Sequence, residues 1–142
     1  MGFKPQEWME SQVLRPGVYV VSVDGFEEQV RADGTVRLRV VFRVEDDEGD
    51  KELVDWWKEG VAPVARRVMA LARLLDPALL YQEYPSQLAF FKAVLEKAKG
   101  KLLRVQVVTY QRADGTPAAR VNAILGLVEG QPKSRDEVDL PF

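Results

Sequence analysis

The clearest structural signal in this sequence is the stretch DGTVRLRVVFRV at residues 33–44. Side chains of a β-strand point alternately to opposite faces, so a strand over 35–44 has two different faces. One face is apolar: Val36, Leu38, Val40, Phe42 and Val44. The other face is rich in arginine: Arg37, Arg39, Val41 and Arg43. The pair Asp33-Gly34 is typical of a tight hairpin turn, so the stretch predicts an amphipathic strand that completes a β-hairpin.

Patterns typical of strands continue on both sides of this stretch. Upstream, Val18–Val23 is rich in β-branched and aromatic residues, which favours a first strand. Downstream, the acidic turn Glu45–Asp50 leads to a third strand over Lys51–Lys58, which contains Trp56 and Trp57. Adjacent residues on a strand face opposite sides, so we expect one tryptophan in the core and the other exposed. The pattern does not decide which one is exposed.

Helical spacing replaces this alternation in the middle of the chain. Apolar residues recur at helical intervals: Val61, Val64, Ala65, Val68, Leu71, Ala72 and Leu75. Asp76-Pro77 ends this helix, and a second helix is predicted over Ser86–Lys99, with Ser86 as its N-cap and Gly100 after its end. Alternation resumes over 102–111 and 118–127, so the predicted order is β-β-β-α-α-β-β, a mainly β protein with an α insertion (α+β).

A five-residue motif occurs twice. Arg31-Ala32-Asp33-Gly34-Thr35 returns as Arg112-Ala113-Asp114-Gly115-Thr116, and Arg39-Val40 returns at the same offset as Arg120-Val121. One interpretation is that two hairpins share a favourable turn chemistry. The other is that both hairpins present arginines to the same ligand.

Composition narrows the range of functions. The chain has 142 residues, a net charge of −2, and neither cysteine nor histidine. One domain fits this length, and disulfides, zinc fingers, thiol nucleophiles and histidine-based catalysis are excluded. No apolar run suits a membrane span or a signal peptide, so we expect a cytoplasmic protein without membrane contact and without a cofactor. The high content of Arg and Glu favours a heat-adapted host.

The C-terminal segment differs from the rest of the chain. Residues 129–135 are polar and rich in Gly and Pro, which predicts a flexible linker after a folded domain of residues 1–128. The final seven residues, Asp136–Phe142, are acidic and close with Leu140, Pro141 and Phe142. Exposed Leu and Phe favour a peptide that binds an apolar pocket on a partner, with acidic residues at its rim. The alternative is that this segment folds back onto its own domain.

The sequence Asp136-Glu137-Val138-Asp139-Leu140-Pro141-Phe142 resembles the acidic tail of single-stranded DNA-binding proteins. The two-helix insertion makes the body most similar to the phage type of that family. The resemblance implies an OB-fold-like five-stranded barrel that binds single-stranded DNA during replication, recombination or repair, without catalysis. It also implies that Asp136, Glu137, Asp139, Leu140, Pro141 and Phe142 recruit replication or recombination proteins. A dimer or tetramer is common among such proteins, and a phage-encoded member works in the host cytoplasm.

Binding to DNA requires a local group of basic and aromatic side chains, because the chain without residues 129–142 carries no net charge. The alternating strands supply such residues. The predicted DNA-binding residues are Arg37, Arg39, Arg43, Trp56, Trp57, Arg104, Tyr110, Arg112 and Arg120.

Two other functional classes remain open. The first is a protein-interaction adaptor, in which the C-terminal peptide is the active part and no nucleic acid is bound. The second is a metal-dependent nuclease using Asp46, Asp47 and Asp50, because clustered carboxylates bind hard cations. Hairpin turns also favour acidic residues for backbone reasons, so a solvated turn explains this cluster as well.

Overall fold

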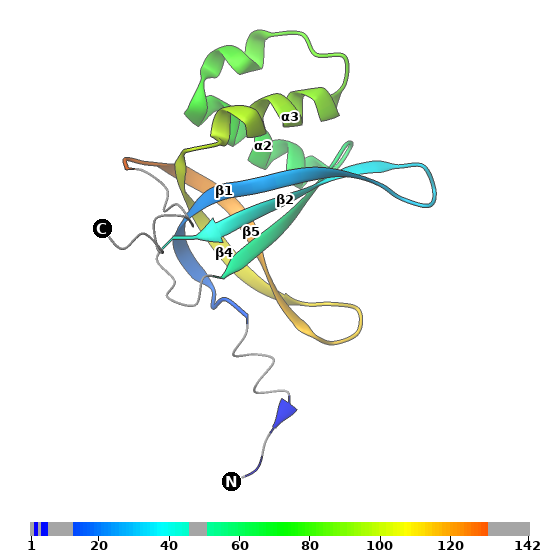
Figure 1. The fold of residues 1–142 in the computed structure, drawn as a ribbon, viewed down its shortest axis with the longest axis vertical. Helices are drawn as coiled ribbons and strands as arrows, with labels where there is room; N and C mark the ends of the chain where they lie inside the picture. The colour runs from blue at the N-terminus through cyan, green and yellow to red at the C-terminus, as the bar shows by residue number, and fades with distance from the viewer. Residues whose placement is uncertain (1, 3, 6–12, 46–50, 131–142) are drawn as a thin grey trace, which may run out of the picture.

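The structure, a computed structural model, describes residues 2, 4, 5, 13–45 and 51–130. Over residues 13–45 and 51–130 it is mainly β, with an antiparallel sheet and two α-helices (Figure 1). The strands and helices are β1 (Gly17–Val30), β2 (Val36–Val44), β3 (Glu52–Lys58), α2 (Ala62–Leu75), α3 (Gln87–Ala98), β4 (Leu102–Gln111) and β5 (Pro117–Val128). This order confirms the predicted β-β-β-α-α-β-β arrangement. A short 3₁₀ helix, η1 (Pro77–Tyr81), was not predicted, and it begins where the Asp76 carboxylate accepts a hydrogen bond from the Ala78 amide.

The sheet is built around β1, in the strand order β3-β2-β1-β4-β5. β1 is longer than the predicted strand over 18–23 because it continues through an irregularity between Val23 and Gly25. Residues 17–22 pair with β4, and residues 21–30 pair with β2. A bulge bends a strand and increases its twist, so one strand can serve two differently directed halves of the sheet.

The sheet curls until its two edge strands, β3 and β5, come into contact (Figure 1). In the described residues these two strands are not neighbours in the hydrogen-bonded order, so the sheet is open along a seam between them. This architecture is consistent with the predicted OB-fold-like α+β class.

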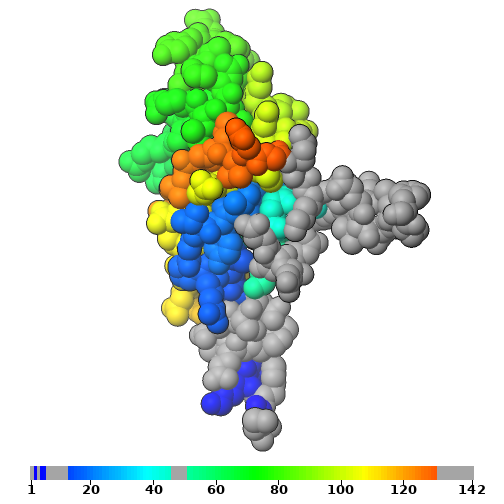
Figure 2. Space-filling model, turned by 90° about the vertical axis from the view of Figure 1, so that its left-hand side faces the viewer, coloured from blue at the N-terminus to red at the C-terminus, as the bar shows by residue number. Residues whose placement is uncertain are grey.

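The core fills the inside of the curled sheet and the space beneath the helices. Trp57, Phe42 and Phe91 are among its largest fully buried side chains, and the rings of Trp57 and Phe91 meet edge to face at 5.9 Å. The helices stack together at one end of the sheet, as Figure 2 shows from the side in green. Ser86 caps α3, as predicted, by accepting a hydrogen bond from the Ala89 amide at 3.1 Å. None of the described helices has both the length and the apolar character required to cross a lipid bilayer.

The repeated five-residue motif forms two matching hairpin turns, at 31–35 and 112–116. In each, one aspartate oxygen accepts hydrogen bonds from the amide and hydroxyl of the following threonine, at 3.0 and 2.6 Å for Asp33 and 2.9 and 2.6 Å for Asp114. These threonine hydrogen bonds hold the pKa of both aspartates below the ordinary value. Gly34 and Gly115 have φ of 86° and 84°, where glycine avoids strain. The shared turn chemistry is therefore confirmed.

Candidate nucleic-acid interface

The outer face of β2 and β3 carries an arginine stacked on a tryptophan. The guanidinium carbon of Arg37 lies 3.7 Å from the centroid of the Trp56 ring, and Arg39 pairs directly with Trp56 across the two strands. A guanidinium over an indole ring is a favourable cation–π pair. Trp56 remains 37% exposed. This face therefore presents a flat ring that is held in place and flanked by positive charge.

Trp57 points the opposite way, as the alternation of a strand requires. It is fully buried, and its indole nitrogen donates a hydrogen bond to Asp55 Oδ2 at 3.0 Å. The expectation of one core and one exposed tryptophan is confirmed, with Trp56 as the exposed residue. Trp57 is consequently removed from the set of residues that could contact DNA directly.

One donor of Arg37 has no partner. Its Nε is buried and finds no hydrogen-bond acceptor in the part of the chain that the structure describes. Buried donors of this kind are uncommon in folded proteins, and here the guanidinium is packed over the Trp56 ring. The position of Arg37 against Trp56 places this donor beside the exposed ring.

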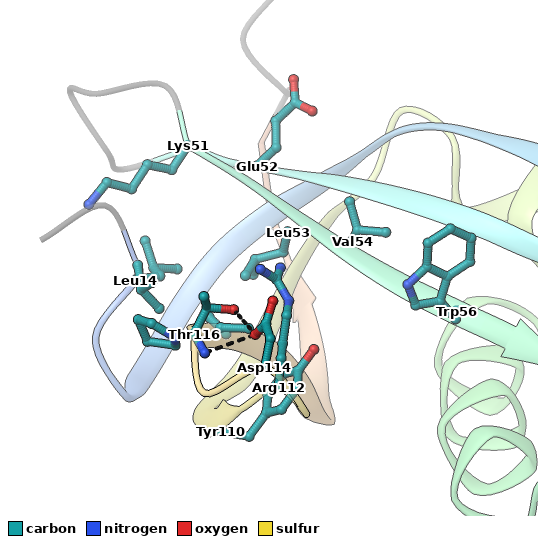
Figure 3. A pocket seen from close by; sticks show the side chains of 14 residues that line it. Leu14, Lys51, Glu52, Leu53, Val54, Trp56, Tyr110, Arg112, Asp114 and Thr116 are labelled. Carbon is teal, nitrogen blue, oxygen red and sulfur yellow. Dashed lines mark hydrogen bonds between the residues drawn. The ribbon is translucent and has the colours of Figure 1, made fainter. Parts of the chain in front are cut away.

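A groove of about 630 Å³ runs between β3 and the β4–β5 hairpin (Figure 3). Trp56 lies on the β3 side, whereas Tyr110 and Arg112 lie on the hairpin side. Apolar side chains, including Leu14 and Leu53, also line it. The groove thus has an aromatic ring on each of its two sides.

Positive charge in the groove itself is balanced. Lys51 and Arg112 line it together with Glu52 and Asp114, and the Asp114 carboxylate is occupied by Thr116. Arg120 adds a cation next to the hairpin wall, because its guanidinium carbon lies 5.7 Å from the Tyr110 ring centroid. The groove therefore supplies stacking surfaces, and arginines at its margins supply the excess of positive charge.

The predicted basic stripe on β2 is shorter than expected. Arg43 is only 6% exposed, and its guanidinium pairs with Glu45 at 3.2 Å. Glu45 also accepts a hydrogen bond from the buried Ser22 hydroxyl. The prediction that Arg43 shares the exposed stripe is wrong, because this end of the outer face is covered and the arginine neutralises a buried carboxylate.

Three of the predicted residues line the groove: Trp56, Tyr110 and Arg112. Arg37, Arg39 and Trp56 lie on the β2–β3 side, whereas Tyr110, Arg112 and Arg120 belong to the β4–β5 side. Arg104 is exposed but pairs with Val20 and Gly126, about 20 Å along β4 from Tyr110 at the usual rise of a strand. The tail residues Asp136, Glu137, Asp139, Leu140, Pro141 and Phe142 lie outside the described residues.

A buried ion pair fixes α2 against β3 beside the interface. Arg67 donates to both carboxylate oxygens of Asp55, at 2.9 and 3.1 Å. Burial raises the pKa of Asp55, and the Arg67 charge together with the Trp57 hydrogen bond opposes this shift. The pair is structural, because it joins two core elements. The apolar spacing of residues 61–75 predicted the helix but did not identify this ion pair.

Carboxylates give no sign of a metal centre in the described ranges. Residues 13–45 and 51–130 contain no group of three or more Asp or Glu placed to share a cation. The acidic turn with Asp46, Asp47 and Asp50 lies outside the described residues, so the nuclease alternative stays a prediction.

Comparison of the sequence with models of known protein families, and with curated protein sequences, gives no match.

Proposed function

We propose that this protein binds single-stranded DNA without sequence preference and acts, without catalysis, in replication, recombination or repair. The observation that carries the proposal is the groove along the open seam, with Trp56 on one wall and Tyr110 on the other. Bases of any sequence stack on aromatic rings, and arginines beside such rings attract the phosphate backbone. Arg37, Arg39, Arg112 and Arg120 occupy these positions.

The proposal treats the curled sheet as an OB-type, partly open barrel. In such barrels, oligonucleotides bind on the face of the second and third strands and at the loops joining strands 1–2 and 4–5. Here that face holds the Arg37–Trp56 stack, and the two loops are the matching turns at 31–35 and 112–116. The agreement between the repeated motif and the two loops supports a shared ligand for both hairpins.

A fluorescence titration tests the proposal. We expect an unstructured oligodeoxythymidylate to quench tryptophan emission at low salt, because bases stack on the exposed Trp56, and added salt to reverse the quench, because salt competes for phosphate contacts. A Trp56→Phe variant is the control: it should keep binding, measured by the anisotropy of a labelled oligonucleotide, and lose most of the quench. If the wild-type protein shows neither quenching nor an anisotropy change at low salt, the proposal is wrong.

The second part of the proposal concerns the C-terminal peptide, and it rests on the sequence. We propose that Asp136–Phe142 recruits replication or recombination proteins through Leu140, Phe142 and the neighbouring acids. The apolar residues suit a small pocket on the partner, and the carboxylates suit a basic rim around it.

Truncation after Arg135 separates this function from the adaptor alternative. The truncated protein should bind single-stranded DNA as tightly as the full chain or more tightly, because it loses acids that compete with phosphate. Anisotropy titrations of both proteins at equal salt measure this. If the protein is an adaptor without a nucleic-acid site, neither the full chain nor the truncated protein should bind DNA. A large loss of affinity on truncation would instead place the DNA site in the tail.

A further inference from the structure

A second hollow, of about 450 Å³, lies between α2 and β5. Three arginines line it, namely Arg66, Arg67 and Arg120, and its described lining includes no Asp or Glu. Arg67 is occupied by Asp55, whereas Arg66 and Arg120 are exposed. This hollow therefore has the excess of positive charge that the aromatic groove lacks.

The two hollows follow one another along β5. On one side, the groove is lined by residues 51–54 and 56, at β3, and the second hollow by α2, which follows β3 in the chain. On the other side, β5 contributes residues 117–119 to the groove and 120 and 122–124 to the second hollow. On both sides, therefore, the residues that line the second hollow come later in the chain than those that line the groove. The span from Pro117 to Ile124 is about 23 Å at the rise of a β-strand.

Arg120 joins the two hollows. Its guanidinium lies 5.7 Å from the ring centroid of Tyr110, which lines the groove, and its side chain also lines the hollow beside α2. A DNA strand with a base stacked near Tyr110 therefore meets the Arg120 guanidinium as it runs toward α2. Arginine is well suited to hold phosphate, because its planar group donates several hydrogen bonds at once.

We infer that single-stranded DNA leaving the groove continues along β5 into the hollow beside α2 and that Arg66 and Arg120 bind its phosphates there. This inference rests on the proposed function and adds a direction and a second contact region to it. The strand passes from an aromatic section, which holds bases, to an arginine section, which holds the backbone.

The test compares a double variant, Arg66→Gln with Arg120→Gln, with the control Arg73→Gln, which removes an exposed arginine of α2 outside the hollow. Oligodeoxythymidylates of about 4 and about 16 nucleotides span the range of site sizes for one such domain. For the long oligonucleotide, the double variant loses two phosphate contacts. The steepness of its plot of log affinity against log salt should therefore fall by about 1.4. For the short oligonucleotide, which is held in the groove, the double variant should lose at most the Arg120 contact, a reduction of about 0.7. The Arg73→Gln control should keep the wild-type slope for both oligonucleotides.

Thermal unfolding of each variant checks whether the fold is intact. A double variant with the wild-type slope for the long oligonucleotide would overturn the inference, as would an equal loss of slope in the Arg73→Gln control. In both cases quenching by the short oligonucleotide would still support the groove as the binding site. Absence of quenching in the wild-type protein would instead remove the proposed function, and this inference with it.

Discussion

On the proposed function, we expect the Trp56→Ala substitution to weaken binding of single-stranded DNA by about 1–3 kcal/mol, which corresponds to roughly 5- to 150-fold in affinity. The substitution removes the exposed ring on the β3 side of the groove, and it also removes the surface on which Arg37 is stacked. Anisotropy of a labelled oligodeoxythymidylate measures the change without relying on the tryptophan signal. The variant should lose less stability than a Trp57→Ala variant, because Trp56 is 37% exposed whereas Trp57 is fully buried.

Tyr81→Ala is the matched control for this substitution. Tyr81 is an aromatic residue of η1 that is 87% exposed and does not line the groove. Its removal should leave DNA affinity unchanged, whereas Trp56→Phe should keep most of it by preserving a stacking ring. Equal effects of the Trp56 and Tyr81 variants would show that the groove has no special role.

Replacing Arg67 with alanine will destabilise the fold by about 3 kcal/mol, because it leaves the buried carboxylate of Asp55 without its partner. Urea unfolding at neutral pH measures the loss. An exposed ion pair provides the control: Lys92→Ala removes the partner of Glu28 on the surface, where both side chains are more than 40% exposed. That control should cost less than about 1 kcal/mol.

The Arg67 effect should also depend on pH. Burial already raises the pKa of Asp55, and removal of the opposing arginine raises it further. Between the ordinary pKa of an aspartate and this raised value, the folded state binds more protons than the unfolded state, so stability increases as pH falls. The difference between Arg67→Ala and wild type should therefore be largest at pH 7 and smaller at pH 5. A difference that does not change with pH would indicate lost packing instead of an unpaired charge.

Much of the fold followed from local patterns. Alternation at residues 33–44 identified β2 and its hairpin, Ser86 and Gly100 marked the limits of α3, and Asp76-Pro77 marked the end of α2. These signals depend on a few neighbouring residues, and the structure confirms them. The full length of β1 was not predictable in this way. Its second half follows a bulge between Val23 and Gly25 and is defined by its pairing with β2.

Sequence patterns placed individual residues of the candidate site on strand faces, but they did not predict how these residues assemble. The alternation placed Arg37, Arg39 and Arg43 on one face, yet it carried no information on what covers that face, and Arg43 proved to be buried with Glu45. Likewise, Arg66 lay off the apolar stripe of its helix, which suits any solvated arginine. Its place beside Arg120 depends on how α2 packs against β5, a long-range contact that no local pattern encodes.

The central position of β1 has a consequence for how the chain folds. The β1–β2 and β4–β5 pairs are hairpins closed by short turns, so each forms at a small cost in chain entropy. The β1–β4 pair, in contrast, encloses β2, β3 and the whole helical segment in one long loop. Pairing of such distant segments is slow. We therefore expect the two hairpins to form early and the docking of β4 on β1 to limit the folding rate.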